Sequence, residues 1–282
     1  LHSFPTRRSS DLVLIYKLLN QKRDMSEQSM NSIQGHWALA KMGKKVLRPG
    51  GKELTNKMIN KLGITTSDEV VEFAPGLGFT ANIALNHRPK TYTGVELDKK
   101  AAAILQKKIN GQGRKIIVGN AAQTTLNDSS ADKLYGEAML TMQSDKDKRK
   151  IMQEAARLLR KDGLYGIHEI ALIPDDIADD LKDNIRRGMS RAINVNVRPL
   201  TTNEWKQMLQ EEGFEIVWVD TNPMHLLKTG RLLSDEGLWR CLKITFNILT
   251  HRKERKIILN MRKVFKQYEK YMRSIAIVAK KI

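Results

Sequence analysis

The fold is decided by the stretch Val70-Val71-Glu72-Phe73-Ala74-Pro75-Gly76-Leu77-Gly78-Phe79-Thr80-Ala81. It begins as an apolar run that ends near an acid, a pattern typical of a buried parallel strand. A turn containing proline and glycine follows, and the segment from Phe79 to Leu85 then predicts a helix. Strand, turn and helix together predict a nucleotide-binding crossover, in which Gly76 and Gly78 let the backbone bring its amides close to a ligand. The positive end of the new helix would face that ligand.

Two cofactor interpretations compete at this turn. The spacing Gly76-x-Gly78-x-x-Ala81 also fits the fingerprint of dinucleotide-binding proteins, and Glu96 lies twenty positions after Gly76, where an acid that binds ribose belongs. Glu72, near the carboxyl end of the strand, would repel a pyrophosphate, whereas it would attract the ammonium and sulfonium groups of S-adenosylmethionine. We therefore favour S-adenosylmethionine over NAD. A glycine-rich turn without any ligand is the third interpretation.

Composition limits the class of protein. The chain has 282 residues, of which 41% are hydrophobic, enough for one large core or for a core and a cap. Its formal net charge of +18 suggests an anionic partner, which could be a substrate, a nucleic acid or a membrane surface. The single cysteine, Cys241, excludes an internal disulfide and a thiol cluster for zinc, so we expect no metal site and a cytoplasmic location. No apolar run reaches the roughly 18 residues that would span a bilayer.

The N-terminal region divides into two parts. Residues 1–12 resemble translated sequencing-adapter read-through, and we leave them out of the functional interpretation. Residues 13–63 predict a helical extension, with helices over 13–20, 32–47 and 53–62. This extension either covers one edge of the sheet or places His36, Trp37 and Arg48 over the active site.

From Glu69 onward, predicted strands and helices alternate. This alternation predicts an α/β, Rossmann-like core with a doubly wound, mostly parallel seven-stranded sheet. The strands are expected over residues 70–74, 91–96, 115–118, 133–140, 164–173, 214–219 and 274–279. The helices are expected over residues 79–86, 99–109, 146–160, 175–187 and 201–212. The core would span residues 64–228, followed by a helical insertion over 229–273 and a last core strand within 274–282.

The order of these motifs resembles class I S-adenosylmethionine-dependent methyltransferases, the broad group that includes ubiquinone-biosynthesis-type enzymes. The resemblance covers about residues 64–228 and 274–282, and it also implies that the last strand is antiparallel. It implies that the residues in contact with the cofactor are Glu72, Ala74, Gly76, Gly78, Glu96, Leu97, Asn120 and Ala121. In that family the acid at Glu96 holds the two ribose hydroxyls, and the pair at Asn120-Ala121 lies beside the adenine.

Two of these positions depart from the family pattern. Ala74 replaces the first glycine of the loop, and Asn120 replaces an acid, although its carbonyl can still bond an adenine amino group. Motifs of competing classes are absent from the sequence. It has no Asn-Pro-Pro-Tyr-type motif for methylation of base amino groups, and no Tyr-x-x-x-Lys pair of a dehydrogenase.

Methyl transfer from a sulfonium is an in-line displacement, which needs alignment and exclusion of water. A general base is needed only if the nucleophile must lose a proton. The candidate catalytic residues are Tyr135 and Glu137 after the fourth strand and His168 on the fifth. His168 is either the base or a hydrogen-bonded core histidine. Glu137 and its neighbour on the fifth strand, Glu169, are carboxylates on buried strands, so each needs a partner.

The insertion is the predicted substrate lid. Residues 238–249 are apolar with Arg240 and Lys243 interspersed, a basic run follows over 251–256, and helical spacing predicts a packed amphipathic helix from Ile257 to Met272. The segment is a cap over an apolar substrate pocket, a surface that contacts an anionic membrane transiently through residues 238–256, or a solvated face. We expect a small, apolar or anionic substrate. RNA binding or RNA methylation is the alternative, but no base-stacking module accompanies the charge, so we do not expect a nucleic-acid partner.

Overall fold

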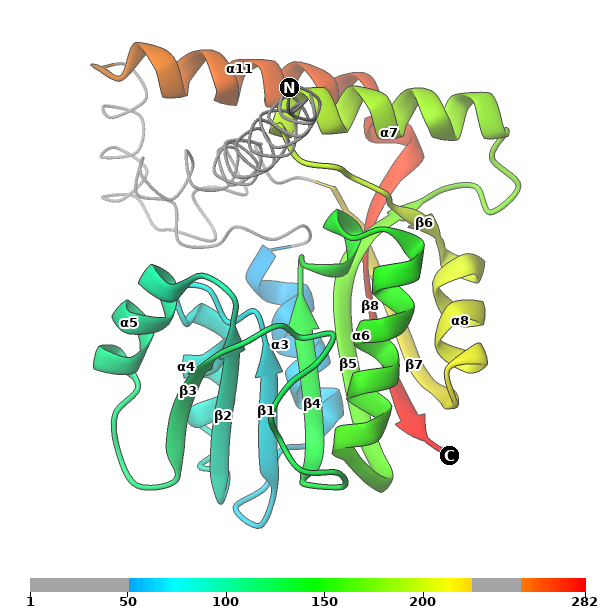
Figure 1. Ribbon diagram of the computed structural model, residues 1–282. Coiled ribbons are helices and arrows are strands. Elements are labelled where there is room, and N and C mark those ends of the chain that lie inside the picture. Colours follow the sequence, from blue (N-terminus) through cyan, green and yellow to red (C-terminus); the bar gives the residue numbers. More distant parts are fainter. Residues whose placement is uncertain (1–50, 225–249) are drawn as a thin grey trace, which may run out of the picture.

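The computed structural model describes residues 51–224 and 250–282 (Figure 1). The predicted helices over 13–20 and 32–47, the residues His36, Trp37 and Arg48, and the segment 238–249 lie outside the described residues. The described chain forms one sheet with helices on both faces. Two long helices, α7 (Asp179–Ile193) and α11 (Arg252–Gln267), lie across one end of that sheet.

Eight strands of the described residues make up the sheet, in the order β3-β2-β1-β4-β5-β8-β7, and the short β6 (Leu200–Thr201) pairs with β5 off this path. The strands on the path are β1 (Glu69–Phe73), β2 (Thr91–Glu96), β3 (Arg114–Val118), β4 (Ala131–Glu137), β5 (Leu159–Leu172), β7 (Phe214–Pro223) and β8 (Met272–Lys281). Strands β1 to β5 are parallel, whereas β8 runs antiparallel between β5 and β7. The predicted α/β class, with its mostly parallel sheet and antiparallel last strand, is confirmed.

Strand β5 begins earlier than its sequence suggests. We expected a helix up to residue 160 and a strand after Gly163, but α6 (Asp145–Leu158) ends first and the strand begins at Leu159. Leu159 pairs with Ala131 of β4, and the Arg160 guanidinium donates to Asp132 at 2.7 Å. These contacts extend the strand through residues 159–163, whose own sequence resembles the end of a helix.

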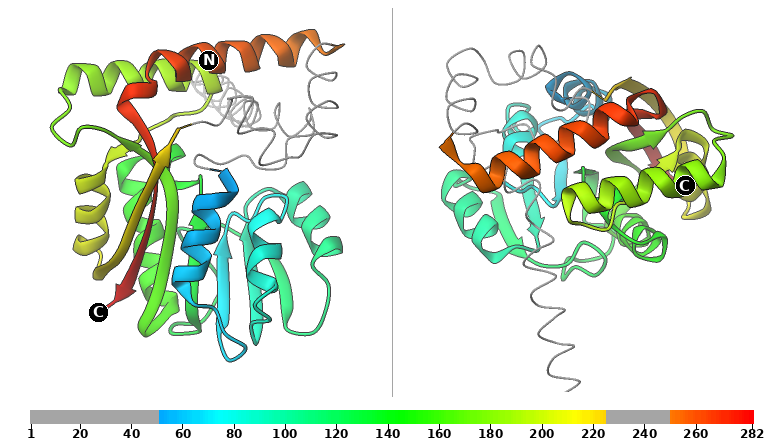
Figure 2. Two further views of the ribbon diagram at one scale, coloured as in Figure 1. Left: turned by 180° about the vertical axis from the view of Figure 1, so that it is seen from behind. Right: turned by 90° about the horizontal axis from the view of Figure 1, so that it is seen from above.

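Helices cover the two faces of the sheet unequally (Figures 1 and 2). The helices α3 (Gly51–Leu62), α4 (Phe79–Leu85) and α5 (Lys99–Lys108) bury their apolar side chains on one face, in a cluster that includes Met58, Ala81 and Leu105. The other face is covered by α6 and α8 (Thr202–Glu211). Helix α8 begins with the predicted cap, since the Thr201 and Glu204 side chains each bond the other residue's backbone amide.

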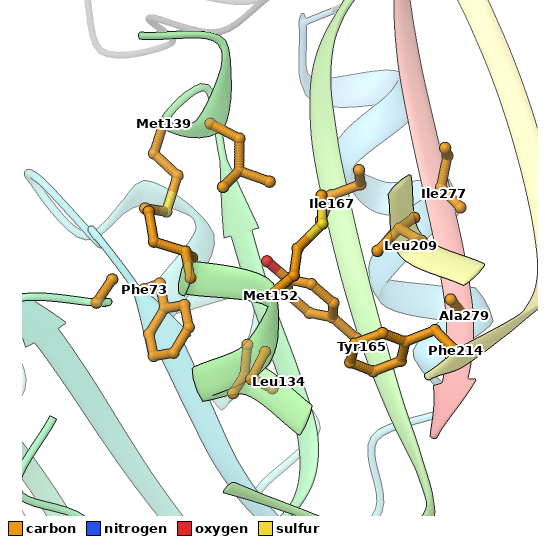
Figure 3. Packing of buried hydrophobic residues seen from close by; sticks show 14 of the residues in the cluster. Phe73, Leu134, Met139, Met152, Tyr165, Ile167, Leu209, Phe214, Ile277 and Ala279 are labelled. Carbon is orange, nitrogen blue, oxygen red and sulfur yellow. The ribbon is translucent and has the colours of Figure 1, made fainter. Parts of the chain in front are cut away.

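The largest apolar cluster lies between the sheet and α6 and α8 (Figure 3). It contains Phe73 at the end of β1, Met152 of α6 and the ring of Tyr165, which lies 5.4 Å from the ring of Phe214 at a 41° tilt. All four side chains are fully buried or nearly so. This packing holds the ends of the parallel strands, from which the site is built, in one rigid frame.

A separate apolar cluster joins α7 and α11 to the end of the sheet. Ile185 and Met189 of α7 pack with Met261 and Phe265 of α11, and the cluster continues onto Met272 at the start of β8. The apolar spacing predicted for the second half of the insertion is thus the buried face of α11. None of the helices in residues 51–224 and 250–282 has the length and apolar character needed to cross a membrane.

Candidate active site

The loop after β1 makes the expected sharp turn. Ala74 and Gly76 have positive φ angles of 52° and 54°, and Gly78, which caps α4, has a φ of 80°. The Ala74 amide donates to the carbonyl of Val95 at 2.8 Å, and the Gly78 amide donates to the carbonyl of Pro75 at 2.9 Å. A Cβ atom at Gly78 would lie 2.2 Å from Cδ1 of Leu105, whereas one at Gly76 would meet open space. The loop is therefore packed against α5 on one side and open at its apex.

Glu96 ends β2 directly beside this loop. Its side chain is buried, its Oε2 accepts the Gly76 amide at 2.9 Å, and its Oε1 accepts the Asp98 amide at 3.0 Å. Each oxygen keeps a second lone pair for a further donor such as a ribose hydroxyl. Leu97, the next residue, is 70% exposed.

Asn120 and Ala121 follow β3 at the same end of the sheet. The side-chain carbonyl of Asn120 accepts the Ala122 amide at 2.9 Å, which closes a local turn. Asn120 is exposed and Ala121 is buried. Since the asparagine carbonyl is already engaged once, only its second lone pair and its amide group remain for an adenine ring.

Glu72 lies below the loop in a buried site, with a side chain that accepts two phenolic hydroxyls. Tyr92 donates to its Oε2 at 2.5 Å and Tyr135 donates to the same atom at 2.8 Å. Burial, and then the charge of Glu72, hold the pKa of Tyr92 well above its usual value. The Tyr135 hydroxyl is thus engaged with a carboxylate, and its catalytic role stays a prediction.

The two remaining catalytic candidates, Glu137 and His168, are in direct contact. Nδ1 of His168 lies 2.7 Å from Oε1 of Glu137, and both side chains are buried. Thr55 of α3 donates to the same oxygen at 2.7 Å, and Thr80 of α4 donates to Oε2 of Glu137. Side chains from three elements that are distant in sequence, α3, α4 and β5, therefore converge on the carboxylate at the end of β4.

Sequence reasoning missed Thr55 and Thr80. Each is a polar residue on the buried face of an otherwise apolar helix stripe, as Thr55 shares its face with Met58 and Leu62. A hydroxyl at a core position of a helix is the signal that could have identified them, because a buried hydroxyl needs a partner.

Glu169 has the partners that its buried position predicted. It accepts the backbone amides of Met139, Leu140 and Thr141 and the hydroxyl of Thr141, at 2.7 to 3.0 Å. Burial raises the pKa of Glu169, and the four hydrogen bonds oppose that rise. Glu169 therefore anchors the loop that follows Glu137 to the neighbouring strand β5.

The loop, the acid of β2 and the turn after β3 together fit S-adenosylmethionine. The open apex at Gly76 admits a ligand, Glu96 offers a carboxylate at the strand end, and the exposed Leu97 offers an apolar surface. Within residues 51–224 and 250–282, no group of three or more His, Cys, Asp or Glu side chains is arranged to hold a metal ion.

Comparisons with known proteins agree with this fit. Residues 71–167 match the methyltransferase domain family. A phosphoethanolamine N-methyltransferase 2 of Haemonchus contortus, solved with phosphomonomethylethanolamine and S-adenosylhomocysteine, is 15% identical, with a TM-score of 0.65 over 88% of this chain and 57% of its own. A geranyl diphosphate methyltransferase, solved with S-adenosylmethionine, is 14% identical, with a TM-score of 0.60 over 81% of this chain and 84% of its own.

Fold, site and family match define a class I S-adenosylmethionine-dependent methyltransferase, with S-adenosylmethionine as its cofactor. An uncharacterized protein of Haemophilus influenzae is 36% identical over 251 residues, which are 88% of this chain and 98% of that protein. The chain belongs to the same family as this relative. The comparisons do not distinguish the ubiquinone-biosynthesis group from other groups of the class.

Proposed function

We propose that this enzyme transfers the methyl group of S-adenosylmethionine to a small, apolar or anionic molecule, and that Glu137 and His168 act beside the reacting atoms. The proposal rests above all on the buried contact between these two side chains, next to Thr80 in the first turn after the glycine-rich loop. A buried carboxylate–imidazole pair whose carboxylate ends a parallel strand lies where catalysis is expected in an open α/β sheet.

The cofactor would be held by the residues around the loop. Glu96 would accept the ribose hydroxyls, Leu97 would cover the adenine, and Glu72 would present its charge toward the ammonium group. Ala74, Gly76 and Gly78 would give the backbone its close approach, and Asn120 and Ala121 would lie beside the adenine. When bound, S-adenosylmethionine supplies an electrophilic methyl group on a sulfonium.

The hydrogen bond between Glu137 and His168 sets the chemistry of the pair. An ionised carboxylate can only accept, so in the proposed mechanism Nδ1 of His168 carries the proton in this contact and the imidazole lone pair lies on Nε2. Nε2 is buried, so the acceptor must reach it before this nitrogen takes the acceptor's proton, while the acceptor's electron pair attacks the methyl carbon. The Glu137 carboxylate then stabilises the imidazolium, as the acid of a catalytic triad does.

Two observations support the substrate class. One structural neighbour named above was solved with phosphomonomethylethanolamine, and the other is named as a geranyl diphosphate methyltransferase. Both compounds are small molecules with an anionic group. The net charge of +18 favours anions near the protein surface.

The proposal is tested by following a labelled methyl group. The purified enzyme and tritiated S-adenosylmethionine are incubated with an extract of H. influenzae cells that lack the gene of the 36% identical relative, which would accumulate the unmethylated acceptor. The extract is then separated into small molecules, RNA and protein. We expect label in the small-molecule fraction, and none with the Glu96→Ala variant. Label confined to RNA or protein would overturn the proposal.

A further inference from the structure

The exposed face of α11 carries a straight row of cations. Lys256, Leu259, Lys263, Lys266 and Lys270 follow one another at intervals of three and four residues, which places them on one side of the helix and its continuation. Lys256, Lys263, Lys266 and Lys270 are exposed, and Leu259 is 53% exposed. We call these five residues the α11 stripe. It spans about 21 Å at the usual rise of an α-helix.

Charge on this part of the chain is strongly one-sided. From Arg255 to Arg273, both included, there are seven basic side chains and one acid, Glu269. Within the described residues, no ion pair joins Lys256, Lys263 or Lys266 to an acid. These three lysines therefore present cationic charge that no acid of the described part of the chain neutralises.

The stripe faces away from the protein core. The opposite side of α11 buries Ile258, Met261 and Phe265 against α7, and both helices lie over the end of the sheet where β4 and β5 terminate (Figures 1 and 2). Glu137 lies at the end of β4, and its partner His168 lies beside it on β5, four residues before that strand ends. A flat surface that met the stripe would therefore lie on the side of the molecule that holds the active site.

At one end the stripe leads into a surface pocket. This pocket is lined by Pro223 at the end of β7 and by Lys266, Gln267, Glu269, Lys270 and Arg273. Three cations against one acid favour an anionic group of phosphate size at this position.

We propose that the α11 stripe docks the enzyme on an anionic lipid surface and that the pocket beside it receives a lipid phosphate. Lysines flanking an exposed leucine match such a surface, because the ammonium groups attract the headgroups while the leucine enters the interface. The apolar face of α11 stays packed against α7. Single-stranded nucleic acid fits less well, since the described side chains of α11 expose no aromatic ring for base stacking. The proposal is independent of the identity of the methyl acceptor.

The test compares two triple variants of the full chain that carry the same net charge. The stripe variant carries Lys256→Gln, Lys263→Gln and Lys266→Gln. The control variant carries Lys107→Gln, Lys108→Gln and Lys115→Gln, at exposed positions of α5 and β3. Binding to vesicles of phosphatidylcholine, with and without 30% phosphatidylglycerol, is measured by flotation at about 0.1 M salt, where surface charges further apart than about 10 Å are screened.

We expect the stripe variant to lose about fivefold in vesicle affinity per lysine, or roughly 100-fold in total, and the control variant to lose much less. Leu259→Ala should weaken binding severalfold. An equal loss of vesicle affinity in both triple variants would mean that net charge alone explains the binding, and it would overturn the proposal. So would unchanged vesicle binding of the stripe variant, or a selective loss of binding to a single-stranded RNA. A thermal shift with S-adenosylmethionine confirms that each variant is folded.

Discussion

The backbone amide of Gly76 donates to Oε2 of Glu96 at 2.9 Å, across the gap between the loop after β1 and the end of β2. One carboxylate therefore orders the glycine-rich loop and also faces the position proposed for the ribose. Loop geometry and cofactor affinity are coupled through Glu96 because both depend on the same two oxygen atoms.

Glu96→Gln should weaken S-adenosylmethionine binding roughly 10- to 100-fold, because hydrogen bonds to a charged acceptor are worth about 1.5–3 kcal/mol. Isothermal titration calorimetry measures the dissociation constant. The matched control is Asp98→Ala, which removes the cap of α5 formed by bonds to the Lys100 and Ala101 amides. The control should lower stability by about 1 kcal/mol without changing affinity, and equal affinity losses in the two variants would contradict the assignment.

Glu137→Gln should lower kcat at least ~100-fold, the usual contribution of a positioned acid or base, while the dissociation constant of S-adenosylmethionine changes little. Once an acceptor is found, steady-state kinetics and calorimetry separate the two effects. Glu154→Gln provides a comparison, since Glu154 is also a buried carboxylate, bonded to Thr124 and Arg157 and not to Glu137 or His168. A comparable fall of kcat in Glu154→Gln would show that any lost carboxylate disables the enzyme, and would remove the catalytic role of Glu137.

The two glycines of the loop should differ in their tolerance of alanine. Gly76→Ala should cost about 1–2 kcal/mol, the strain of a left-handed conformation, which Ala74 already adopts nearby. Gly78→Ala adds a clash with Leu105 and should cost about 1–3 kcal/mol more. Urea unfolding gives both free energies. The reverse order would mean that the loop is not packed against α5.

Glu169 should make stability depend on pH. Burial raises its pKa above the ordinary value of 4.5, so between these two values the folded chain holds a proton that the unfolded chain has lost. Its contribution to stability is therefore largest below pH 4.5 and falls as the pH rises through the raised pKa. The free energy of unfolding of the wild type, minus that of Glu169→Gln, should decrease with pH across this window. An increase would mean that the four hydrogen bonds outweigh burial.

Local patterns were sufficient to predict most of the sheet. Apolar runs such as Val70-Val71 predicted β1 within one residue at either end, and residues 91–96 were predicted as they are found in β2. Such strands are buried on both faces, so their hydrophobicity is visible without knowledge of their neighbours. The start of β5 was not visible, because it depends on contacts with Ala131 and Asp132.

The acids of the candidate site could be selected from the sequence, whereas their hydrogen-bond partners could not. Glu72, Glu137 and Glu169 stood out as acids on apolar strands, yet their partners come from distant segments, such as Tyr135 for Glu72 and Thr55 for Glu137. Register between strands determines which side chains meet, and a single sequence gives strand positions but not that register.

The antiparallel position of β8 has a consequence for how the protein is made. Its ten residues lie between β5 and β7 and bury Ile275 to Ala279 completely, yet the ribosome synthesises them after every other described strand. Until β8 emerges, β5 and β7 have no shared neighbour and both leave a backbone edge unpaired, a state prone to aggregation. A nascent chain can thus complete the β3 to β5 half of the sheet during translation, whereas β7 must wait for the final strand before it can join.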